Sequence, residues 1–346
     1  MITVLAMMGV LWGTGAAMGT PKRARWVMIV VLLGAVIALQ LALPNGHPLR
    51  QATGSDVRLW LLIFAFIAIG YGYRAVLRKV KARANATHTP AAHNGPFSDI
   101  ELDRYARHIM LREVGGQGQK ALKKAKVLVV GAGGLGAPVL QYLAAAGVGT
   151  IGVIDDDLVE NANLQRQVIH TDAQIGRAKV LSAADAMTAQ NPYVTVHPYH
   201  RRLTPEIATT LIVEYDLVLD GTDNFATRYA VNAACAQLGK PLIAGALTQW
   251  EGQISLYDPA RGAPCYACIF PDAPDPVLVP SCAEAGVIGP LPGMIGAMMA
   301  LETIKEITGA GEGLRGRLMI YDALYVQTRV ISAKRRADCR VCAGLH

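Results

Sequence analysis

Acidic residues are nearly absent from the first quarter of this 346-residue chain. Residues 1–84 contain ten Lys and Arg but one acid, Asp56, so the segment carries a formal charge of +9. The other 262 residues hold 23 basic and 25 acidic side chains, a formal charge of −2. The net charge of +7 therefore belongs to the N-terminal quarter. Because nucleic-acid binding needs a basic face on the binding domain, we expect no nucleic-acid partner for the remainder.

Other features that the sequence lacks disfavour further classes of protein. It contains no G-x-x-x-x-G-K-[ST] loop, which disfavours a P-loop ATPase, and no internal repeat is evident. The first 18 residues have neither a basic start nor a clear cleavage site, so a removed signal peptide is disfavoured.

Long apolar runs, in contrast, are present near the N-terminus. Residues 26–43 are apolar apart from Gln40, residues 59–77 form a second run, and residues 1–18 form a weaker third. At about 1.5 Å per helical residue, such runs nearly cross a hydrocarbon core of about 30 Å. The sequence predicts a membrane anchor of two to three transmembrane helices over residues 1–84. A buried helical hairpin of a soluble protein is the alternative.

Basic side chains flank these runs unevenly. The loop between the second and third segments has only Arg50 and Arg58, whereas the other flanks carry Lys22, Arg23, Arg25, Arg74, Arg78, Lys79, Lys81 and Arg83. The positive-inside rule then predicts that both clusters, and everything after residue 84, lie in the cytosol. We expect the cytoplasmic membrane as the location.

Residues 85–98 are small and polar with two prolines, which is typical of a flexible linker. Beyond the linker, residues 99–346 are predicted to form one domain in which short apolar strands alternate with helices. Strands are expected at 126–130, 150–154, 194–198, 216–220 and 241–245, with later antiparallel strands at 250–257 and 315–331 and a helix at 291–308 between them. This order predicts an α/β fold, a Rossmann-like, doubly wound and mainly parallel sheet with an antiparallel C-terminal part.

A glycine-rich turn follows the first of these strands and opens a helix. Its glycines are Gly131, Gly133, Gly134 and Gly136. Glycine permits close approach of backbone to phosphate, and a helix N-terminus offers free N–H groups. Asp155 ends the next strand, where an acid can bond ribose hydroxyls. The pattern predicts a nucleotide site, and by itself it fits an NAD-dependent dehydrogenase equally well.

Three charged residues favour a triphosphate over a nicotinamide. Arg166 and Lys179 follow the second strand and Asp223 follows the fourth, so they should meet at the carboxyl edge of the sheet. Each alone could be a surface charge. Together they supply cations and a carboxylate for Mg²⁺, which a triphosphate needs and a nicotinamide ring does not.

These residues resemble the MoeB/ThiF/HesA family, the bacterial relatives of ubiquitin-activating enzymes. The matches run from about residue 99 to 344 and include Arg104-Tyr105-Ala106-Arg107, GAGGLG (131–136), Asp155, NLQRQ (163–167), Ile175-Gly176, DLVLDGTDN (216–224) and Ser281-Cys282 before AEAGV. The details are closer to MoeB, the molybdopterin-synthase adenylyltransferase, than to ThiF. The resemblance places the chain in a bacterium.

The resemblance implies a homodimer that binds ATP with Mg²⁺. The terminal glycine carboxylate of a small carrier protein ending in Gly-Gly would attack the α-phosphate. A MoaD-like carrier for molybdenum-cofactor biosynthesis is the leading expectation, and a ThiS-like carrier for thiamine biosynthesis is the second. A nicotinamide-dependent oxidoreductase and a catalytically silent membrane scaffold are the alternatives from other classes.

The resemblance also implies residue roles. Asp155 would hold the ribose, and Asp223 would position Mg²⁺. Arg107 would reach in from the partner subunit like an arginine finger. The phosphates would be contacted by Asn163, Arg166 and Lys179.

The cysteines form two C-x₂-C pairs, Cys265 with Cys268 and Cys339 with Cys342. Four thiolates suit a closed tetrahedral Zn²⁺ site. A redox pair or four unrelated thiols are the alternatives, and the resemblance favours structural zinc, because many relatives carry this site.

Cys282 lies in a segment where some relatives form a thioester or acyl-disulfide with the carrier. No His or basic residue lies close in sequence to lower the pKa of its thiol. A catalytic role for Cys282 is therefore less expected than a thiol that takes no part in the reaction. Cys235, in an apolar helix, is expected to pack in the core. The chain ends four residues after Cys342 without the rhodanese domain of some relatives, so a separate sulfur donor is expected.

Overall fold

The computed structural model describes residues 2–44, 46–54, 58, 60, 62, 65–66, 69–70, 72–79, 95–273 and 285–345. The chain divides into two units, Met1–Ala91 and Ala92–His346. Each unit is described by itself. The division falls within the linker predicted at residues 85–98.

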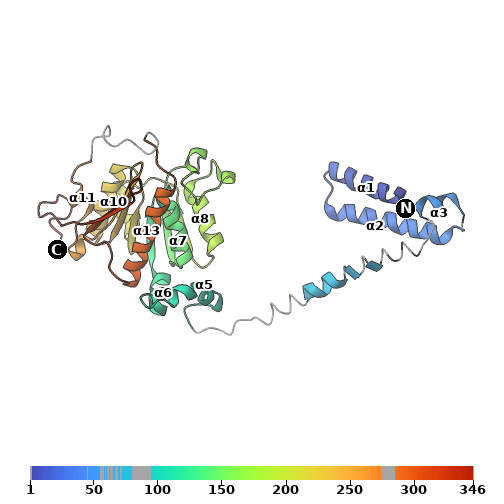
Figure 1. Ribbon diagram of the computed structural model, residues 1–346, viewed down its shortest axis with the longest axis horizontal. Helices are drawn as coiled ribbons and strands as arrows, with labels where there is room; N and C mark the ends of the chain where they lie inside the picture. The colour runs from blue at the N-terminus through green and yellow to red at the C-terminus, as the bar shows by residue number, and fades with distance from the viewer. Residues whose placement is uncertain are drawn as a thin grey trace. The chain divides into compact units, whose positions relative to one another are not determined.

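The N-terminal unit contains the helices α1 (Ile2–Ala17), α2 (Lys22–Ala42) and α3 (Pro48–Thr53), and the described residues 72–79 are also helical (Figure 1). Among the described residues, α2 alone is long and apolar enough to cross a membrane, with 21 residues and a mean hydropathy of 2.2. The helix α1 is apolar but shorter. The predicted run at 59–77 lies partly outside the described residues. One of the two to three predicted spans therefore has a helix of suitable length and composition.

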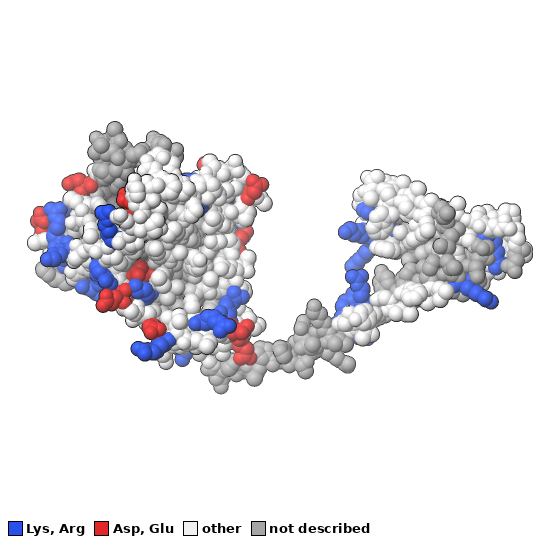
Figure 2. All heavy atoms as spheres, viewed as in Figure 1, with Lys and Arg blue, Asp and Glu red and all other residues white. Residues whose placement is uncertain are grey.

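The helices of this unit pack through a small apolar core. Its buried members are Val4, Ile29, Leu33, Val36 and Trp60. Most of the remaining apolar side chains are exposed, as on the outer face of α2 at Val27, Val30 and Val31. On the face in view, Figure 2 shows basic side chains at the margins of these helices and uncharged surface between them. Within the described part of this unit, the helices thus bury one apolar face against each other.

The second unit is built on one eight-stranded sheet with the order β3-β2-β1-β4-β5-β6-β7-β8. Its strands are β1 (Lys126–Val130), β2 (Thr150–Ile154), β3 (Thr195–Tyr199), β4 (Leu217–Asp220), β5 (Leu242–Leu247), β6 (Glu251–Tyr257), β7 (Arg317–Asp322) and β8 (Gln327–Ser332). The first five pair in parallel and the last three pair antiparallel. The predicted Rossmann-like, doubly wound and mainly parallel sheet is confirmed.

Helices cover both faces of this sheet. One face carries α7 (Gly136–Ala146), α8 (Lys179–Gln190) and α13 (Pro290–Thr308), which Figure 1 shows next to one another; the other carries α9 (Pro205–Ile212) and α10 (Phe225–Leu238). The strand β1 shows how the two cores form. Val127 and Val129 join the core under α7, and Leu128 and Val130 join the core on the opposite face, because successive side chains of a strand point to opposite sides.

The order of the strands reverses between β1 and β4, which are parallel neighbours in the sheet although β2 and β3 come between them in sequence. In doubly wound sheets, ligands bind beyond the carboxyl ends of the strands at such a switch point. The turn after β1, the residues after β2 and the loop after β4 all lie at this edge.

Helix α5 (Asp99–Ile109) begins with a capping box, in which Ser98 and Glu101 bond reciprocally. Two elements differ from the sequence-based expectation. A further helix, α6 (Gly115–Lys124), was not expected, because three glycines in its first turn lower its helix propensity. The stretch 315–331 is not one strand but the hairpin of β7 and β8.

Candidate nucleotide-binding site

The glycine turn after β1 leaves little room for side chains on its inner side. A Cβ on Gly136 would lie 1.9 Å from the carbonyl oxygen of Gly131, whose own φ is +95°. Both positions therefore require glycine. A Cβ on Gly133 would meet nothing closer than the Nε2 of Gln167 at 3.6 Å. This part of the turn faces open space, where a ligand can approach the backbone.

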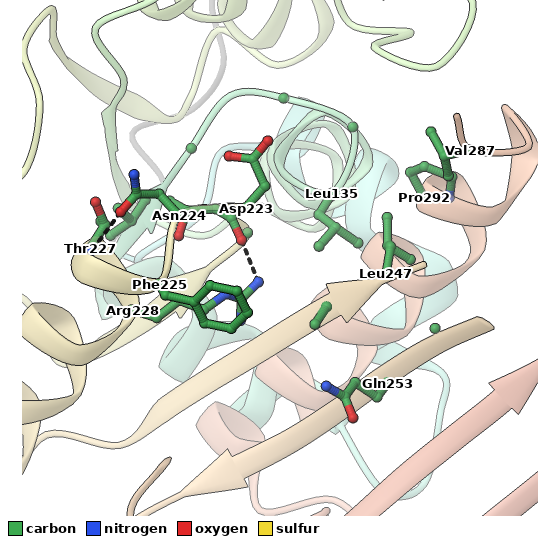
Figure 3. A pocket seen from close by; sticks show the side chains of 18 of the residues that line it. Leu135, Asp223, Asn224, Phe225, Thr227, Arg228, Leu247, Gln253, Val287 and Pro292 are labelled. Atoms are coloured by element: carbon green, nitrogen blue, oxygen red, sulfur yellow. Dashed lines mark hydrogen bonds between the residues drawn. The ribbon is translucent and has the colours of Figure 1, made fainter. Parts of the chain in front are cut away.

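A cavity of about 750 Å³ opens at this edge of the sheet. It is lined by the predicted residues Gly131, Gly133, Gly134, Asp155, Arg166, Lys179 and Asp223, and also by Gln167, Arg228, Leu247, Gln253, Pro292 and Arg329. Figure 3 shows side chains from the loop after β4 on one side and from the antiparallel strands and α13 on another. The structure therefore brings most of the predicted nucleotide residues to one cavity.

Asp155 joins the glycine turn to the residues after β2. One carboxylate oxygen accepts a hydrogen bond from the N–H of Ala132 at 2.8 Å, and the other accepts from the N–H of Asp157 at 2.8 Å. Each carboxylate oxygen can accept a second hydrogen bond. Asp155 thus fixes the turn and still presents acceptors to the cavity.

The two predicted cations are held differently. Lys179 begins α8, and its side chain is 5% exposed and bonds the carboxylate of Asp157 at 2.6 Å, while Asp157 itself is 60% exposed. The aliphatic part of the Lys179 side chain is therefore buried, and its ammonium group lies at the cavity wall. Arg166 is half-buried and bonds the side-chain oxygen of Asn163 at 2.9 Å. Asn163 does not line the cavity, so it orients Arg166.

Asp223 is an exposed carboxylate that lines the cavity. It makes no hydrogen bond or ion pair with another described residue. In Figure 3 its carboxylate points away from Arg228, and the next residue, Asn224, caps α10 by accepting a hydrogen bond from the N–H of Thr227 at 3.0 Å. A carboxylate that has no partner among the described residues, in a cavity that Arg166 and Lys179 also line, is a fitting ligand for Mg²⁺.

Buried polar residues lie behind the glycine turn and were not found by sequence reasoning. His170 places Nε2 3.0 Å from the carbonyl oxygen of Ala132 and Nδ1 2.7 Å from the hydroxyl of Ser182. Burial lowers the pKa of His170, so the ring is neutral at pH 7. Gln167 is also buried, and its Oε1 has no hydrogen-bond partner among the described residues. His170 lies in no motif that marks it, and Gln167 ends the NLQRQ run (163–167), whose resemblance assigned roles only to Asn163 and Arg166.

Arg228 was also missed. It is 5% exposed and donates to the carbonyl oxygen of Gly245 at 2.6 Å and to that of Thr222, and its guanidinium lies 3.8 Å from the carboxylate of Asp220. The only sequence signal is its place four residues after the helix cap Asn224.

Two predicted site residues lie elsewhere. Arg107 is exposed near the end of α5 and does not line the cavity of its own chain. Cys282 lies outside the described residues. The described part of the chain thus brings neither residue to the phosphate region.

The four paired cysteines come together at one buried cluster. The Sγ atoms of Cys265 lie 3.8 Å from Cys268 and 3.6 Å from Cys339, and those of Cys268 and Cys342 lie 3.4 Å apart. A tetrahedral zinc site with Zn–S bonds of about 2.3 Å needs S···S separations of about 3.8 Å. The donor set and its spacing therefore fit zinc. The cluster joins α11 (Tyr266–Ile269) to the C-terminal residues.

The pKa values of the thiols in this cluster shift in different directions. Burial raises the pKa of the Cys265 and Cys342 thiols. Burial also acts to raise the pKa of Cys339, but hydrogen bonds from the backbone of Val341 and Cys342 and with the thiols of Cys265 and Cys268 together lower it to about 7. A thiolate is the form that binds metal. Cys235 is buried in α10 away from the cluster, as expected of a core residue.

A doubly wound sheet with a glycine turn, a strand-end carboxylate and two cations at its switch point defines a nucleotide-binding protein of the dinucleotide-fold class. The model of the ThiF family matches residues 105–341, which is more than half of the chain. The chain belongs to the ThiF family.

Curated relatives agree with this membership. The chain is 50% identical over 246 residues to a sulfur carrier protein adenylyltransferase of Thermus thermophilus, covering 70% of this chain and 91% of that protein. It is 47% identical over 242 residues to the SAMP-activating enzyme E1 of Haloferax volcanii, covering 70% and 89%. It is 51% identical to the probable adenylyltransferase/sulfurtransferase MoeZ of Mycobacterium tuberculosis, covering 69% of this chain and 62% of MoeZ.

Solved structures show the same fold. The structure of Escherichia coli MccB with MccA-N7isoAsn matches with a TM-score of 0.62 and 23% identity, covering 70% of this chain and 75% of that chain. The structure of PaaA matches with a TM-score of 0.60 and 22% identity, covering 75% and 82%. In each case the matched part has the length of the second unit rather than of the whole chain.

Proposed function

We propose that this protein uses ATP to adenylate the C-terminal glycine of a small, ubiquitin-like sulfur-carrier protein. One observation carries the proposal: Arg166, Lys179 and Asp223, which has no partner in the described part of the chain, line one cavity beside the glycine turn. The Thermus thermophilus relative, half identical to this chain, is named for the same reaction.

The reaction joins two anions, which explains the residue types. A carboxylate oxygen of the carrier attacks the α-phosphorus of ATP, the bond from that phosphorus to the bridging oxygen breaks, and pyrophosphate leaves. The product is a carrier acyl-adenylate. The polyphosphate repels the attacking carboxylate, and negative charge grows on the leaving group, so fixed cations accelerate the step.

Each residue of the site has a part in this step. The glycine turn and the N-terminus of α7 receive phosphate oxygens through backbone N–H groups, and Asp155 accepts from ribose hydroxyls. Arg166 and Lys179 neutralise the phosphates. Asp223 would hold Mg²⁺, which when bound supplies further positive charge to the phosphate oxygens.

The carrier is proposed to be a MoaD-like protein ending in Gly-Gly, which places the enzyme in molybdenum-cofactor biosynthesis. A ThiS-like carrier of thiamine biosynthesis is the second candidate. A nicotinamide-dependent oxidoreductase is tested cheaply by thermal unfolding: ATP with Mg²⁺ should raise the melting temperature of this protein, and NAD⁺ should not.

A homodimer is part of the proposal. Arg107 is exposed and lies outside the cavity of its own chain, so it can act on phosphates only from a partner subunit. Exposed apolar side chains on the same unit, including Tyr142 and Leu301, offer surface for such a partner. The role of Cys282 as an acylated thiol stays a prediction.

The Cys₄ cluster is proposed to hold structural Zn²⁺. All four thiols serve as ligands, which leaves no position for a reacting water. The metal would tie the C-terminal residues to α11 and would take no part in the chemistry.

The N-terminal unit is proposed to anchor the enzyme in the cytoplasmic membrane with the adenylation domain in the cytosol. The length and apolar composition of α2 support this proposal, as do the basic side chains that flank the apolar runs. The linker at residues 85–98 would let the domain reach a soluble carrier.

ATP–pyrophosphate exchange tests the assignment of the site. In the presence of carrier, Arg166→Ala and Asp223→Ala should each abolish exchange, because one removes a phosphate cation and the other the Mg²⁺ ligand. Arg261→Ala, an exposed ion-pair residue outside the cavity, is the matched control and should exchange at the wild-type rate. Near-normal exchange by both site variants would refute the assignment.

A further inference from the structure

Arg228 is a buried cation close to Asp223. It is not among the residues proposed to contact the phosphates. Its guanidinium contacts three separate segments: Asp220 at the end of β4, Thr222 in the following loop and Gly245 in β5. A planar guanidinium presents its donors in a fixed fork, so it can hold several acceptors in one arrangement. Arg228 therefore connects two neighbouring strand ends to the loop that carries Asp223.

Thr222 is held from both sides. Its N–H and its hydroxyl donate to one oxygen of Asp220 at 2.9 Å and 2.6 Å. Its carbonyl oxygen accepts from Arg228. Because the peptide group is planar, the hydrogen bond to this carbonyl also fixes the orientation of the backbone nitrogen of Asp223.

The residue after Asp223 is fixed as well. Asn224 caps α10 through its side-chain oxygen, which accepts from the N–H of Thr227 (Figure 3). Asp223 thus stands between two restrained residues, and its own side-chain torsions are the main freedom left to it. Its carboxylate points toward the cavity, away from Arg228 (Figure 3).

Stability alone is a weak reason for this arrangement. A buried ion pair is often no more stabilising than apolar side chains of the same volume, because both charges lose their water. Arg228 and Asp220 are 5% and 1% exposed and sit beneath the loop that carries the proposed Mg²⁺ ligand. Apolar side chains at these two positions would fill the same space. The ion pair, in addition, fixes the position of Thr222 and therefore that of Asp223.

We infer that Arg228 is a positioning residue, which holds the Thr222–Asp223 peptide so that the Asp223 carboxylate meets the metal of the bound nucleotide. The inference rests on the proposed function. Arg228 touches neither nucleotide nor metal in this account. Its effect passes entirely through Asp223.

The test measures ATP binding by calorimetry, on the detergent-solubilised full chain, with EDTA and with saturating Mg²⁺. Arg228→Lys keeps the positive charge and removes the fork. In EDTA it should bind ATP with the wild-type affinity. The factor by which Mg²⁺ increases the ATP affinity should be about tenfold smaller than in wild-type, a loss that is usual when a partner behind a metal ligand is removed. Asp223→Asn should show the same loss, and the double variant should lose no more than Asp223→Asn alone.

Several results would overturn the inference. If Arg228→Lys keeps the full Mg²⁺ enhancement, charge suffices and the fork has no positioning role. If the losses add in the double variant, the two residues act separately. If Arg228→Lys fails to fold, Thr222→Val replaces it, because this variant removes only the hydroxyl bond to Asp220. Thr222→Val should reduce the Mg²⁺ enhancement of ATP affinity by a smaller factor. An unchanged Mg²⁺ enhancement in Thr222→Val contradicts the inference.

Controls separate this inference from the proposed function. Arg261→Lys alters an arginine outside the cavity and should match wild-type in both conditions. If wild-type and Asp223→Asn bind ATP alike with Mg²⁺, the proposed site itself is wrong. If they differ and Arg228→Lys matches wild-type, the positioning role alone is wrong.

Discussion

Gly136 is the residue of the nucleotide site with the least space around it. Its position permits no Cβ, because the carbonyl oxygen of Gly131 occupies that volume. The glycine pattern after β1 was sufficient to predict the turn, since only glycine allows both the positive φ of Gly131 and this close approach. At the residue scale, then, short-range steric demands are visible in the sequence.

Gly136→Ala should therefore disrupt the site. The clash forces the turn or α7 to shift, with an expected loss of about 1–3 kcal/mol in the free energy of unfolding and a loss of ATP binding. Gly116→Ala is the control: its Cβ meets nothing within 4 Å and it lies in α6, so stability should hold or rise slightly. Thermal unfolding with and without ATP measures both effects. Equal stability and ATP affinity in Gly136→Ala would contradict the close approach.

His170 predicts a pH dependence of stability. Burial lowers its pKa below the value of 6.5 that the ring has when exposed. Below that pH the unfolded chain takes up a proton that the folded chain resists, so this residue makes stability fall as the pH drops from about 6.5 toward the lowered folded pKa. Above pH 6.5 its contribution is constant.

Melting temperatures at pH 7.5 and 5.5 test this prediction. Wild-type should lose more stability between the two than His170→Gln, which has no ionisable ring. An identical loss in both proteins would show that His170 does not resist protonation in the folded state.

Arg228 shows which residues of the site the sequence could not predict at this scale. The partners of Arg228 are backbone carbonyls of Thr222 and Gly245 and the carboxylate of Asp220, and Gly245 is brought near only by the pairing of β4 with β5. A contact set by the sheet leaves no motif in the neighbouring residues. Arg166, Lys179 and Asp223 could be predicted because they lie in the connections that follow β2 and β4, whose carboxyl ends meet at the switch point of the sheet.

At the scale of elements, the strands of the parallel sheet could be located closely. β1 and β2 begin and end at the predicted residues, because buried parallel strands are continuous apolar runs bounded by turn residues. The helix α6 escaped prediction because its packing against α13, rather than its composition, stabilises it. The hairpin of β7 and β8 is exposed along β8, so its apolar pattern was weak.

The Cys₄ cluster that joins α11 to the C-terminal residues is predicted to hold zinc. The wild-type protein should contain about one zinc per chain, the stoichiometry of a Cys₄ site. Cys342→Ser removes one ligand and should reduce the zinc content and the melting temperature. Cys235→Ala changes a buried thiol outside the cluster and should leave the zinc content unchanged. Metal analysis of the purified proteins is the measurement, and a zinc-free wild-type chain with the same stability would contradict the site.

At the scale of the whole molecule, the two units are predicted to separate in function. A chain starting at residue 92 lacks α2 and the apolar runs, so it should appear in the soluble fraction and retain ATP–pyrophosphate exchange. The full chain should sediment with membranes until detergent is added. Full-length protein in the supernatant without detergent would contradict the anchor.

The composition of the chain predicted this division, because charge and hydropathy change together near residue 84. What the sequence could not supply is the number of spanning helices. That number depends on how apolar helices pair: α1 packs on α2, and such a contact serves equally well in a membrane or in a protein core.

The most direct measurement of the central claim is the mass of the carrier after incubation with the purified enzyme, ATP and Mg²⁺. Carriers ending in Gly-Gly, of the MoaD and ThiS kinds, are tested in parallel with Asp223→Ala as the inactive enzyme. At least one carrier should gain the mass of an AMP group with the wild-type enzyme, and none should gain it with Asp223→Ala. Carriers that stay unmodified while the wild-type enzyme binds ATP would contradict the proposed adenylation.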